Sequence, residues 1–147
     1  EWVGPYDDEK LGLHKIAKYY YYPGWWEPGP NLSFYVNKTA WNKLPLSYQA
    51  AMEVASAEAC TRMTASYDAK NPAAMSRLLT AGIQVKKFPD DTMEEAHKIS
   101  AEILEENAAK DVAYKNLYEA WKKFRADSYR WFNTAELAFE NFVFPKI

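Results

Sequence analysis

A short loop near the N-terminus, residues 22–30, carries the residue types best suited to holding a ligand. It reads YPGWWEPGP, so two adjacent indoles and the Glu27 carboxylate lie among prolines and glycines. Proline fixes φ and glycine allows positive φ, which predicts a loop of defined shape. Exposed indoles are costly in water, and loops often carry function. Trp25 and Trp26 therefore either line a binding site or fill the edge of a hydrophobic core.

The other reactive residue types have ordinary structural explanations. The acidic run at residues 7–9 is expected to begin a short helix near residues 7–14, where carboxylates favour the open N–H groups. His14 has no second His or Cys near it, and the single cysteine, Cys60, is expected to be a buried, inert thiol. The sequence contains no phosphate-binding glycine loop, zinc-ligand motif or nucleophile motif. We therefore expect no catalytic residues and no enzyme.

The composition is that of one globular domain of 147 residues, with 48% hydrophobic and 26% charged residues. A net charge of −2 argues against a basic nucleic-acid surface, so no nucleic-acid partner is expected. The longest apolar run is far shorter than the roughly 18 residues that cross a bilayer. Aromatic residues reach 16% and gather in residues 1–41 and 114–144, which implies two separate roles.

Short strands alternate with helices along the chain. High β-propensity predicts a strand at residues 17–22, and alternating apolar residues predict another at residues 31–37. A short helix is expected at residues 39–44 and a further strand at residues 83–88, ending at Pro89. With the end of an extended segment expected at residues 1–5, the strand count is near four, and some of the crossover partners that a parallel sheet needs are absent. This pattern indicates that the chain belongs to the α/β class and forms part of a larger fold.

The helices are predicted from apolar spacing and from their end signals. A helix is expected from about residue 47 to residue 70, interrupted by Asn71–Pro72, with a second helix from Pro72 to Ala81 that Gly82 closes. A variant of the capping box at residues 91–94 predicts the next helix, which runs to about Ala108.

Residues 111 to about 140 are expected to form the longest helix, with a wide aromatic stripe. Burial of each ring contributes roughly 1.5–3 kcal/mol, so packing is the expected role of the stripe. A helix of about 30 residues would be about 45 Å long, more than the width of a globule of this size. We therefore expect it to lie across another domain or chain, and predict a homodimer formed through the 111–142 helix.

Five strings of the sequence carry a family resemblance. They are EWVGPYDDEKLG (1–12), YYYYPGWWE (19–27), FYVNK (34–38) followed by Trp41, YDAKNP (67–72) and YEAWKKFR (118–125). Together they resemble the substrate-binding subunits of tripartite ATP-independent periplasmic (TRAP) transporters, in the branch that binds 2-oxoacids and related organic acids. The first string is the most specific of them.

The resemblance implies a fold of two α/β lobes that close around a ligand in the cleft between them. This chain would be the C-terminal half of that two-lobed periplasmic solute-binding protein fold, helix-rich and with a long C-terminal helix. Residues 1–45 would form the cleft and crossing-strand region, residues 46–110 the helices and short strand of the lobe, and residues 111–147 the long aromatic helix and tail.

The same resemblance implies the site and the partners. Glu1 and Glu27 would be carboxylate ligands of a bridging Na⁺ or Ca²⁺, and Trp2 would add a backbone carbonyl and an indole wall. Trp2 and Trp26 would contact the ligand, a 2-oxoacid or hydroxy acid anion. Oxygen donors suit such hard cations, and a cation and an anion neutralise each other in a dry cleft. A periplasmic protein that delivers its ligand to membrane permease subunits is expected.

Two other interpretations stay open at this point. Glu1 and Glu27, flanked by tryptophans that stack on sugars, could form the carboxylate pair of a carbohydrate-active enzyme. The 111–142 stripe could instead make the chain a helical dimerisation module.

Overall fold

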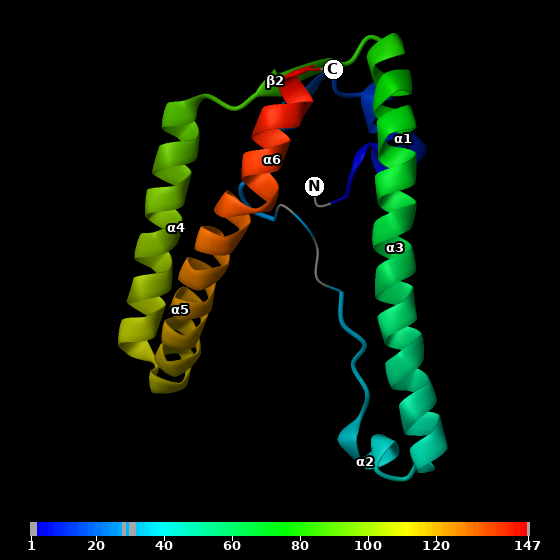
Figure 1. Cartoon of the computed structure of the whole chain (residues 1–147), viewed down its shortest axis with the longest axis vertical. Coiled ribbons are helices and arrows are strands. Elements are labelled where there is room, and N and C mark those ends of the chain that lie inside the picture. The colour runs from blue at the N-terminus through cyan, green and yellow to red at the C-terminus, as the bar shows by residue number, and fades with distance from the viewer. Residues whose placement is uncertain (1–2, 28, 30–31, 147) are drawn as a thin grey trace. The chain divides into compact units, whose positions relative to one another are not determined.

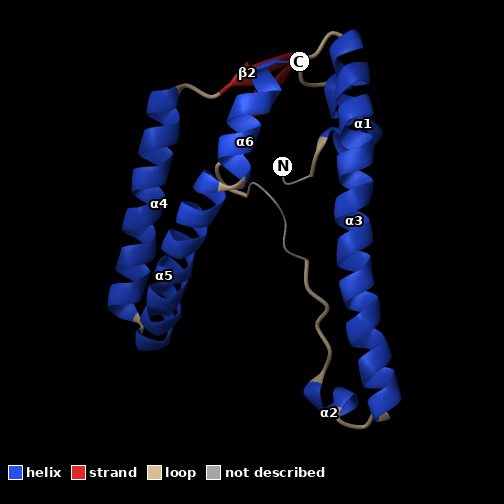
Figure 2. Ribbon diagram, viewed as in Figure 1, coloured by secondary structure: helices blue, strands red, loops and turns tan. Residues whose placement is uncertain are grey.

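The computed structural model describes residues 3–27, 29 and 32–146. The chain divides into two compact units, Glu1–Asp90 and Asp91–Ile147. Figure 1 gives the element order, and Figure 2 shows that helices make up most of both units.

The first unit contains a two-stranded parallel sheet. Strands β1 (Tyr19–Tyr22) and β2 (Gln84–Lys87) pair in register, with Tyr19 opposite Gln84 and Tyr22 opposite Lys87. Parallel strands need a crossover connection, and the chain between these two strands includes a long helix that supplies it. The predicted strands at residues 17–22 and 83–88 are confirmed, with β1 starting two residues later and β2 shorter by one residue at each end.

Three short helical elements precede and follow β1. Helix α1 is Pro5–Leu11 and the 3₁₀ turn η1 is Leu13–Lys15, which confirms helical structure near residues 7–14. Helix α2 is Lys38–Trp41, close to the predicted 39–44. The side chain of Asn37 caps α2 by accepting a hydrogen bond from the N–H of Ala40 at 3.1 Å.

Helix α3 runs without a break from Leu46 to Thr80, a length of 35 residues, so the predicted interruption at Asn71–Pro72 is wrong. Proline lacks the N–H that would bond the carbonyl of Asp68, which weakens one turn. Contacts with α1 lie at this same turn and oppose that loss, because Tyr67 and Asn71 both bond residues of α1. Cys60 is exposed on this helix, not buried as expected.

Gly82 closes α3 as predicted. Its φ is +92°, its N–H donates to the carbonyl of Leu79 at 3.0 Å, and the N–H of Ile83 donates to the carbonyl of Leu78 at 3.1 Å. This pair of bonds is the Schellman motif, which turns the chain sharply into β2. Leu78 and Ile83 on either side of the turn are both buried.

The strand predicted at residues 31–37 is wrong for the part that the structure describes, residues 32–37, which form no regular element. Their large side chains face solvent, with Phe34 76% and Tyr35 95% exposed. An alternating pattern becomes a strand only beside a partner strand, and the sheet of the described residues contains β1 and β2 alone. Asn31 lies outside the described residues.

The second unit is helical. Helix α4 is Asp90–Lys110, starting one residue before the predicted cap at Asp91 and ending two after Ala108. Helix α5 is Val112–Thr134, and the side chain of Asp111 caps it by accepting from the N–H of Tyr114 at 2.8 Å. A bond of 3.0 Å from the ammonium of Lys122 to Glu105 joins α5 to α4.

The single helix predicted for residues 111–140 is wrong, because the chain breaks at Ala135. Helix α6, Glu136–Val143, and the turn η2, Phe144–Lys146, follow that break. Ala135 has ψ −84°, outside the helical range, and the hydroxyl of Thr134 donates to the carbonyl of Arg130 at 3.0 Å. Such back-bonding bends helices. The longest helix of the described chain is α3 instead.

Among the described residues, no helix combines the length and the apolar character that crossing a bilayer requires. The division into residues 1–45, 46–110 and 111–147 stays a prediction.

Candidate ligand-binding site

The first unit contains a cavity of about 820 Å³. Its wall combines β1, α1, α3 and the loop that follows β1, and includes Asp8, His14, Tyr20, Trp26, Glu27 and Tyr67. Sites for small molecules have volumes of roughly 300–1,000 Å³ and combine aromatic walls with a few polar groups. The cavity meets both conditions.

The aromatic loop after β1 is anchored at one side and open at the other. The rings of Trp25 and Trp26 pack edge to face, with 5.5 Å between centroids, and Trp26 packs edge to face on Phe88 at 6.1 Å. The two indoles stay 46% and 48% exposed. Trp26 is therefore compatible with both possibilities left open by the sequence, since it packs on Phe88, directly after β2, and half of it is exposed.

Two of the predicted site residues, which are neighbours in the sequence, lie at the cavity. Trp26 and Glu27 both line the cavity, and Glu27 is exposed there. Glu1 and Trp2 lie outside the described residues, so their predicted roles stay predictions. Among the described residues, no three acidic, His or Cys side chains gather closely enough to hold a metal ion. Glu27 is an oxygen donor of the kind that hard cations prefer, and further donors must complete its set.

The acidic residues of α1 do more than complement the helix dipole. Asp7 and Asp8 lie in the first turn, as predicted, yet each also binds a tyrosine of another element. The hydroxyl of Tyr67 donates to Asp7 and that of Tyr20 donates to Asp8, both at 2.5 Å. Asp8 is 3% exposed. The sequence analysis missed these partners, although successive residues of a helix point about 100° apart and cannot all face solvent when the helix packs on another element.

These contacts perturb the ionisation of the groups that make them. The hydrogen bond to Asp7, with burial, raises the pKa of Tyr67. The hydrogen bond from Arg77 lowers the pKa of Glu9, and the hydrogen bond with Lys10 lowers the pKa of Tyr6. At neutral pH the Tyr67 hydroxyl therefore stays protonated and donating, which keeps α1 fastened at the cavity wall.

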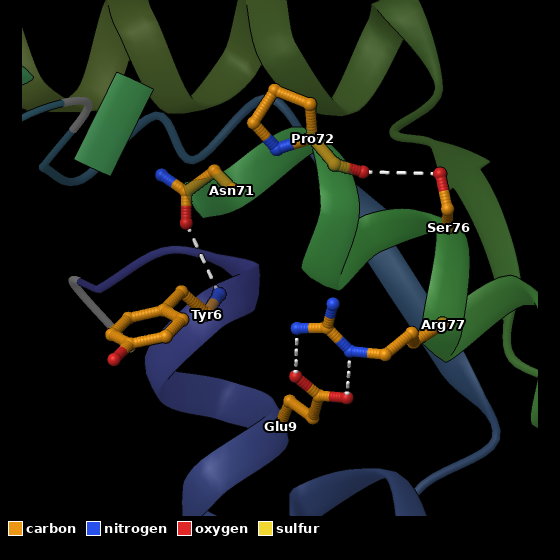
Figure 3. Close-up of polar contacts among 6 residues, drawn as sticks. All are labelled: Tyr6, Glu9, Asn71, Pro72, Ser76 and Arg77. Carbon is orange, nitrogen blue, oxygen red and sulfur yellow. Dashed lines mark hydrogen bonds and ion pairs between the residues drawn. The ribbon is translucent and has the colours of Figure 1, made fainter. Parts of the chain in front are cut away.

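The N-terminus of α1 lies against the C-terminal third of α3, at Asn71. Asn71 accepts a hydrogen bond from the backbone N–H of Tyr6 at 3.1 Å, as Figure 3 shows. A Cβ on Gly4 would lie 2.7 Å from Nδ2 of Asn71, which is too close for ordinary packing. The sequence analysis placed Asn71 at the expected helix interruption and in the YDAKNP string of residues 67–72, but assigned it no part in the site.

A parallel sheet with a helical crossover, and an aromatic cavity lined from the end of a strand, are features of the α/β class. Residues 1–111 match the family model described as bacterial extracellular solute-binding protein, family 7. The chain belongs to this family. The resemblance to TRAP solute-binding subunits and the fold class expected from it are confirmed.

One curated relative is a monocarboxylate 2-oxoacid-binding periplasmic protein of Nostoc sp., 53% identical over 143 residues. The match covers 97% of this chain and 39% of the relative. This chain therefore spans about two-fifths of the length of that relative.

Solved structures agree with this assignment. A TRAP transporter solute-binding protein from Bordetella bronchiseptica RB50, described as a mixed-occupancy dimer with calcium and picolinate, is 43% identical with a TM-score of 0.91. The match covers 99% of this chain and 44% of that one. TRAP periplasmic solute-binding proteins from Colwellia psychrerythraea, with calcium and pyruvate, and Pseudoalteromonas atlantica T6c, with sodium and pyruvate, are 34% and 32% identical. Their TM-scores are 0.89 and 0.88, and each match covers 96% of this chain and 43% of the other.

Proposed function

We propose that the protein is the solute-binding subunit of a TRAP transporter that captures a small 2-oxoacid or hydroxy acid with a bridging Na⁺ or Ca²⁺. It acts in the periplasm and delivers the acid to membrane permease subunits. The observation that carries the proposal is the joint position of Trp26 and Glu27 in the wall of one cavity of suitable volume. The relatives named for 2-oxoacids, pyruvate, calcium and sodium support the choice of ligand and metal.

In this proposal some residues of the site supply charge and others shape the pocket. Glu27 and Glu1, with the backbone carbonyl of Trp2, would hold the cation, which supplies positive charge to the carboxylate of the ligand. The indoles of Trp2 and Trp26 exclude water and shape the pocket, which strengthens the attraction between cation and acid. Neither ion alone would offset the cost of leaving water.

The chain supplies one side of the binding cleft in this proposal. Because it spans about two-fifths of the length of the Nostoc relative, the other lobe in this proposal comes from residues outside the 147. We therefore expect the 147-residue chain alone to bind the acid weakly or not at all. Micromolar binding by this chain alone would contradict a site shared between two lobes.

Calorimetry on the complete protein tests the proposal. Pyruvate and lactate are titrated after dialysis into a sodium-free buffer with a chelator, and again with Ca²⁺ or Na⁺ restored. Binding is expected only with the cation present. The variant Glu27→Gln should weaken binding about 10- to 100-fold, because a charge-assisted contact is worth roughly 1.5–3 kcal/mol. Glu58→Gln is the matched control, since Glu58 lies exposed on α3 beside Arg62. Equal affinity of both variants would remove Glu27 from the site.

We propose that the protein binds and does not catalyse. The relatives that it matches are named as solute-binding proteins. A carbohydrate-active enzyme using Glu1 and Glu27 would release the aryl group of an aryl glycoside, and we expect no release. Turnover that Glu27→Gln abolishes would replace binding by catalysis as the function.

We also propose a homodimer through the region of residues 111–142. Apolar side chains of α5 and α6 are widely exposed, among them Leu117 at 74%, Phe124 at 71% and Trp131 at 64%. A surface of this kind marks an interaction site. Light scattering should give a dimer mass for the complete protein and a monomer mass for Phe124→Glu with Trp131→Glu. Leu46→Glu, at an exposed position of α3, should leave the mass unchanged. A wild-type monomer at high micromolar concentration would exclude the dimer.

A further inference from the structure

We propose that Asn71 is a positioning residue for Val3 and Gly4, which line the cavity and lead into α1. It holds the backbone that directly follows Glu1 and Trp2, the residues proposed to bind the cation and the acid. The inference rests on the proposed function, because the roles of Glu1 and Trp2 come from there. It adds a residue of α3 to the site.

Helix α1 has no cap of its own. Its N-cap residue is Gly4, which has no side chain, and Pro5 follows at the first helical position. The N–H of Tyr6 is the first open donor of the helix, and it donates to Oδ1 of Asn71 at 3.1 Å. Asn71, which lies on α3, therefore accepts a hydrogen bond from an open N–H of α1, as an N-cap side chain would. Figure 3 shows this amide directed at the first turn of α1.

Gly4 is required for this contact because of space, not because of its backbone angles. Its φ of −99° and ψ of −176° are extended values that any residue adopts. A Cβ would lie 2.7 Å from Nδ2 and 2.9 Å from Oδ1 of Asn71, and side-chain carbons do not approach other atoms so closely. The backbone at Gly4 thus lies directly on the amide of Asn71, two residues after Trp2.

The amide projects from a well-supported face of α3. Ala74 and Leu78, which are 0% and 2% exposed, follow Asn71 at helical spacing and anchor this face. Tyr67, one turn before Asn71, binds Asp7. Val3, Gly4 and Asn71 all line the cavity. The contact between Asn71 and the backbone at Gly4 therefore lies in the wall of the proposed site and not behind it.

A second contact between the same helices supplies the matched control. Arg77 binds Glu9 through two hydrogen bonds and fastens α1 to α3 near the C-terminal end of α1 (Figure 3). Its loss lowers the stability of the packing but leaves Gly4 and Tyr6 on Asn71. Comparing loss of the Arg77 contact with loss of the Asn71 contact thus distinguishes weaker packing of α1 as a whole from displacement of the backbone at its N-terminus.

The experiment compares four forms of the complete protein. They are the wild type, Asn71→Leu, which removes the acceptor, Asn71→Asp, which keeps it, and Arg77→Met. Pyruvate is titrated in the presence of Ca²⁺, and hydrogen–deuterium exchange is followed for the peptide of residues 1–9. Circular dichroism and thermal unfolding show that each form folds.

Asn71→Leu should raise the Kd for pyruvate by about tenfold or more, as expected for the loss of a group that orients a metal ligand. It should also speed exchange in residues 1–9. Asn71→Asp should restore both values towards the wild type, and Arg77→Met should lower the melting temperature without the rise in Kd. Gly4→Ala should act as Asn71→Leu does, by displacing the same backbone.

Equal losses of affinity in Asn71→Leu and Arg77→Met, or wild-type affinity in Asn71→Leu, would overturn the inference. A wild-type protein that binds no pyruvate with any cation would instead overturn the proposed function. In that case the exchange data decide the positioning role. Faster exchange in Asn71→Leu but not in Arg77→Met supports it, and equal rates in the two variants refute it.

Discussion

Arg77 binds the carboxylate of Glu9 through two nitrogens of its guanidinium group. Its Nε donates to Oε1 at 2.7 Å and its Nη2 donates to Oε2 at 2.6 Å. This two-point geometry matches the fork of a carboxylate and is stronger than a single contact. The pair joins helices whose contacting residues are 68 positions apart in the chain, so it is a purely tertiary contact.

The Arg77–Glu9 pair makes stability depend on pH in the acid range. Arg77 lowers the pKa of Glu9 in the folded state. The pair therefore stabilises the fold above the pKa of Glu9 in the unfolded chain, and this contribution is lost as pH falls through the lower folded pKa. Glu9→Gln should lower the free energy of unfolding at pH 7, and the difference from wild type should disappear in strong acid.

Denaturant unfolding at pH 7 and in acid measures this effect. The loss should be small, because half of the Arg77 side chain, 55%, is exposed. Glu58→Gln, whose ion pair with Arg62 is fully on the surface, should show almost no change at either pH. A Glu9→Gln deficit that persists in strong acid would mean that the carboxylate acts through packing and not through charge.

Pro72→Ala should stabilise the protein by about 1–3 kcal/mol. The alanine restores an N–H that can bond the carbonyl of Asp68 inside α3, and Pro72 is exposed, so no packing is lost. Pro89→Ala is the control, because Pro89 lies in the loop between β2 and α4 where no helical bond can form. Thermal unfolding measures both. A less stable Pro72→Ala would show that proline favours the backbone geometry that Asn71 needs.

Gly82→Ala should destabilise the protein by about 1–2 kcal/mol. The φ of +92° is unfavourable for a residue with a Cβ, although no atom lies within 4 Å of the place that this Cβ would occupy. The cost therefore arises from the backbone alone. Gly82→Asn should cost less, since asparagine tolerates this region better. Identical losses for both variants in urea unfolding would show that the backbone conformation is not the source of the cost.

Asp111→Ala should lower stability by about 1 kcal/mol, because Asp111 accepts the N–H of Tyr114 and caps α5. Asp111→Asn should keep most of that contribution, since the amide oxygen also accepts. Urea unfolding, followed by helical circular dichroism, measures both variants. An alanine variant as stable as the wild type would indicate that the cap is replaced by water without loss.

Local signals in the sequence were sufficient for elements that depend on few neighbours. Gly82 ends α3 because only a residue without a Cβ readily adopts its φ, whatever surrounds it. The tyrosine run of β1 and the short helix at residues 38–41 also follow from local preference. The composition of residues 22–30 was enough to predict a shaped loop, and Trp26 and Glu27 of this loop line the cavity, while their roles in binding stay predictions.

The tertiary structure decided what depends on residues far apart in the chain. Residues 32–37 have a strand pattern, but a strand also needs a neighbour to accept its hydrogen bonds. Pro72 has the chemistry of a helix breaker, but packing against α1 keeps α3 continuous through it. The hydrogen bond from the N–H of Tyr6 to Asn71 joins positions 65 residues apart, and no local sequence pattern encodes such a contact. The sequence by itself thus determined local propensities and the signals that end helices. Where a local preference competes with a contact between distant residues, only the tertiary structure decided the outcome, because that contact exists only in the folded chain.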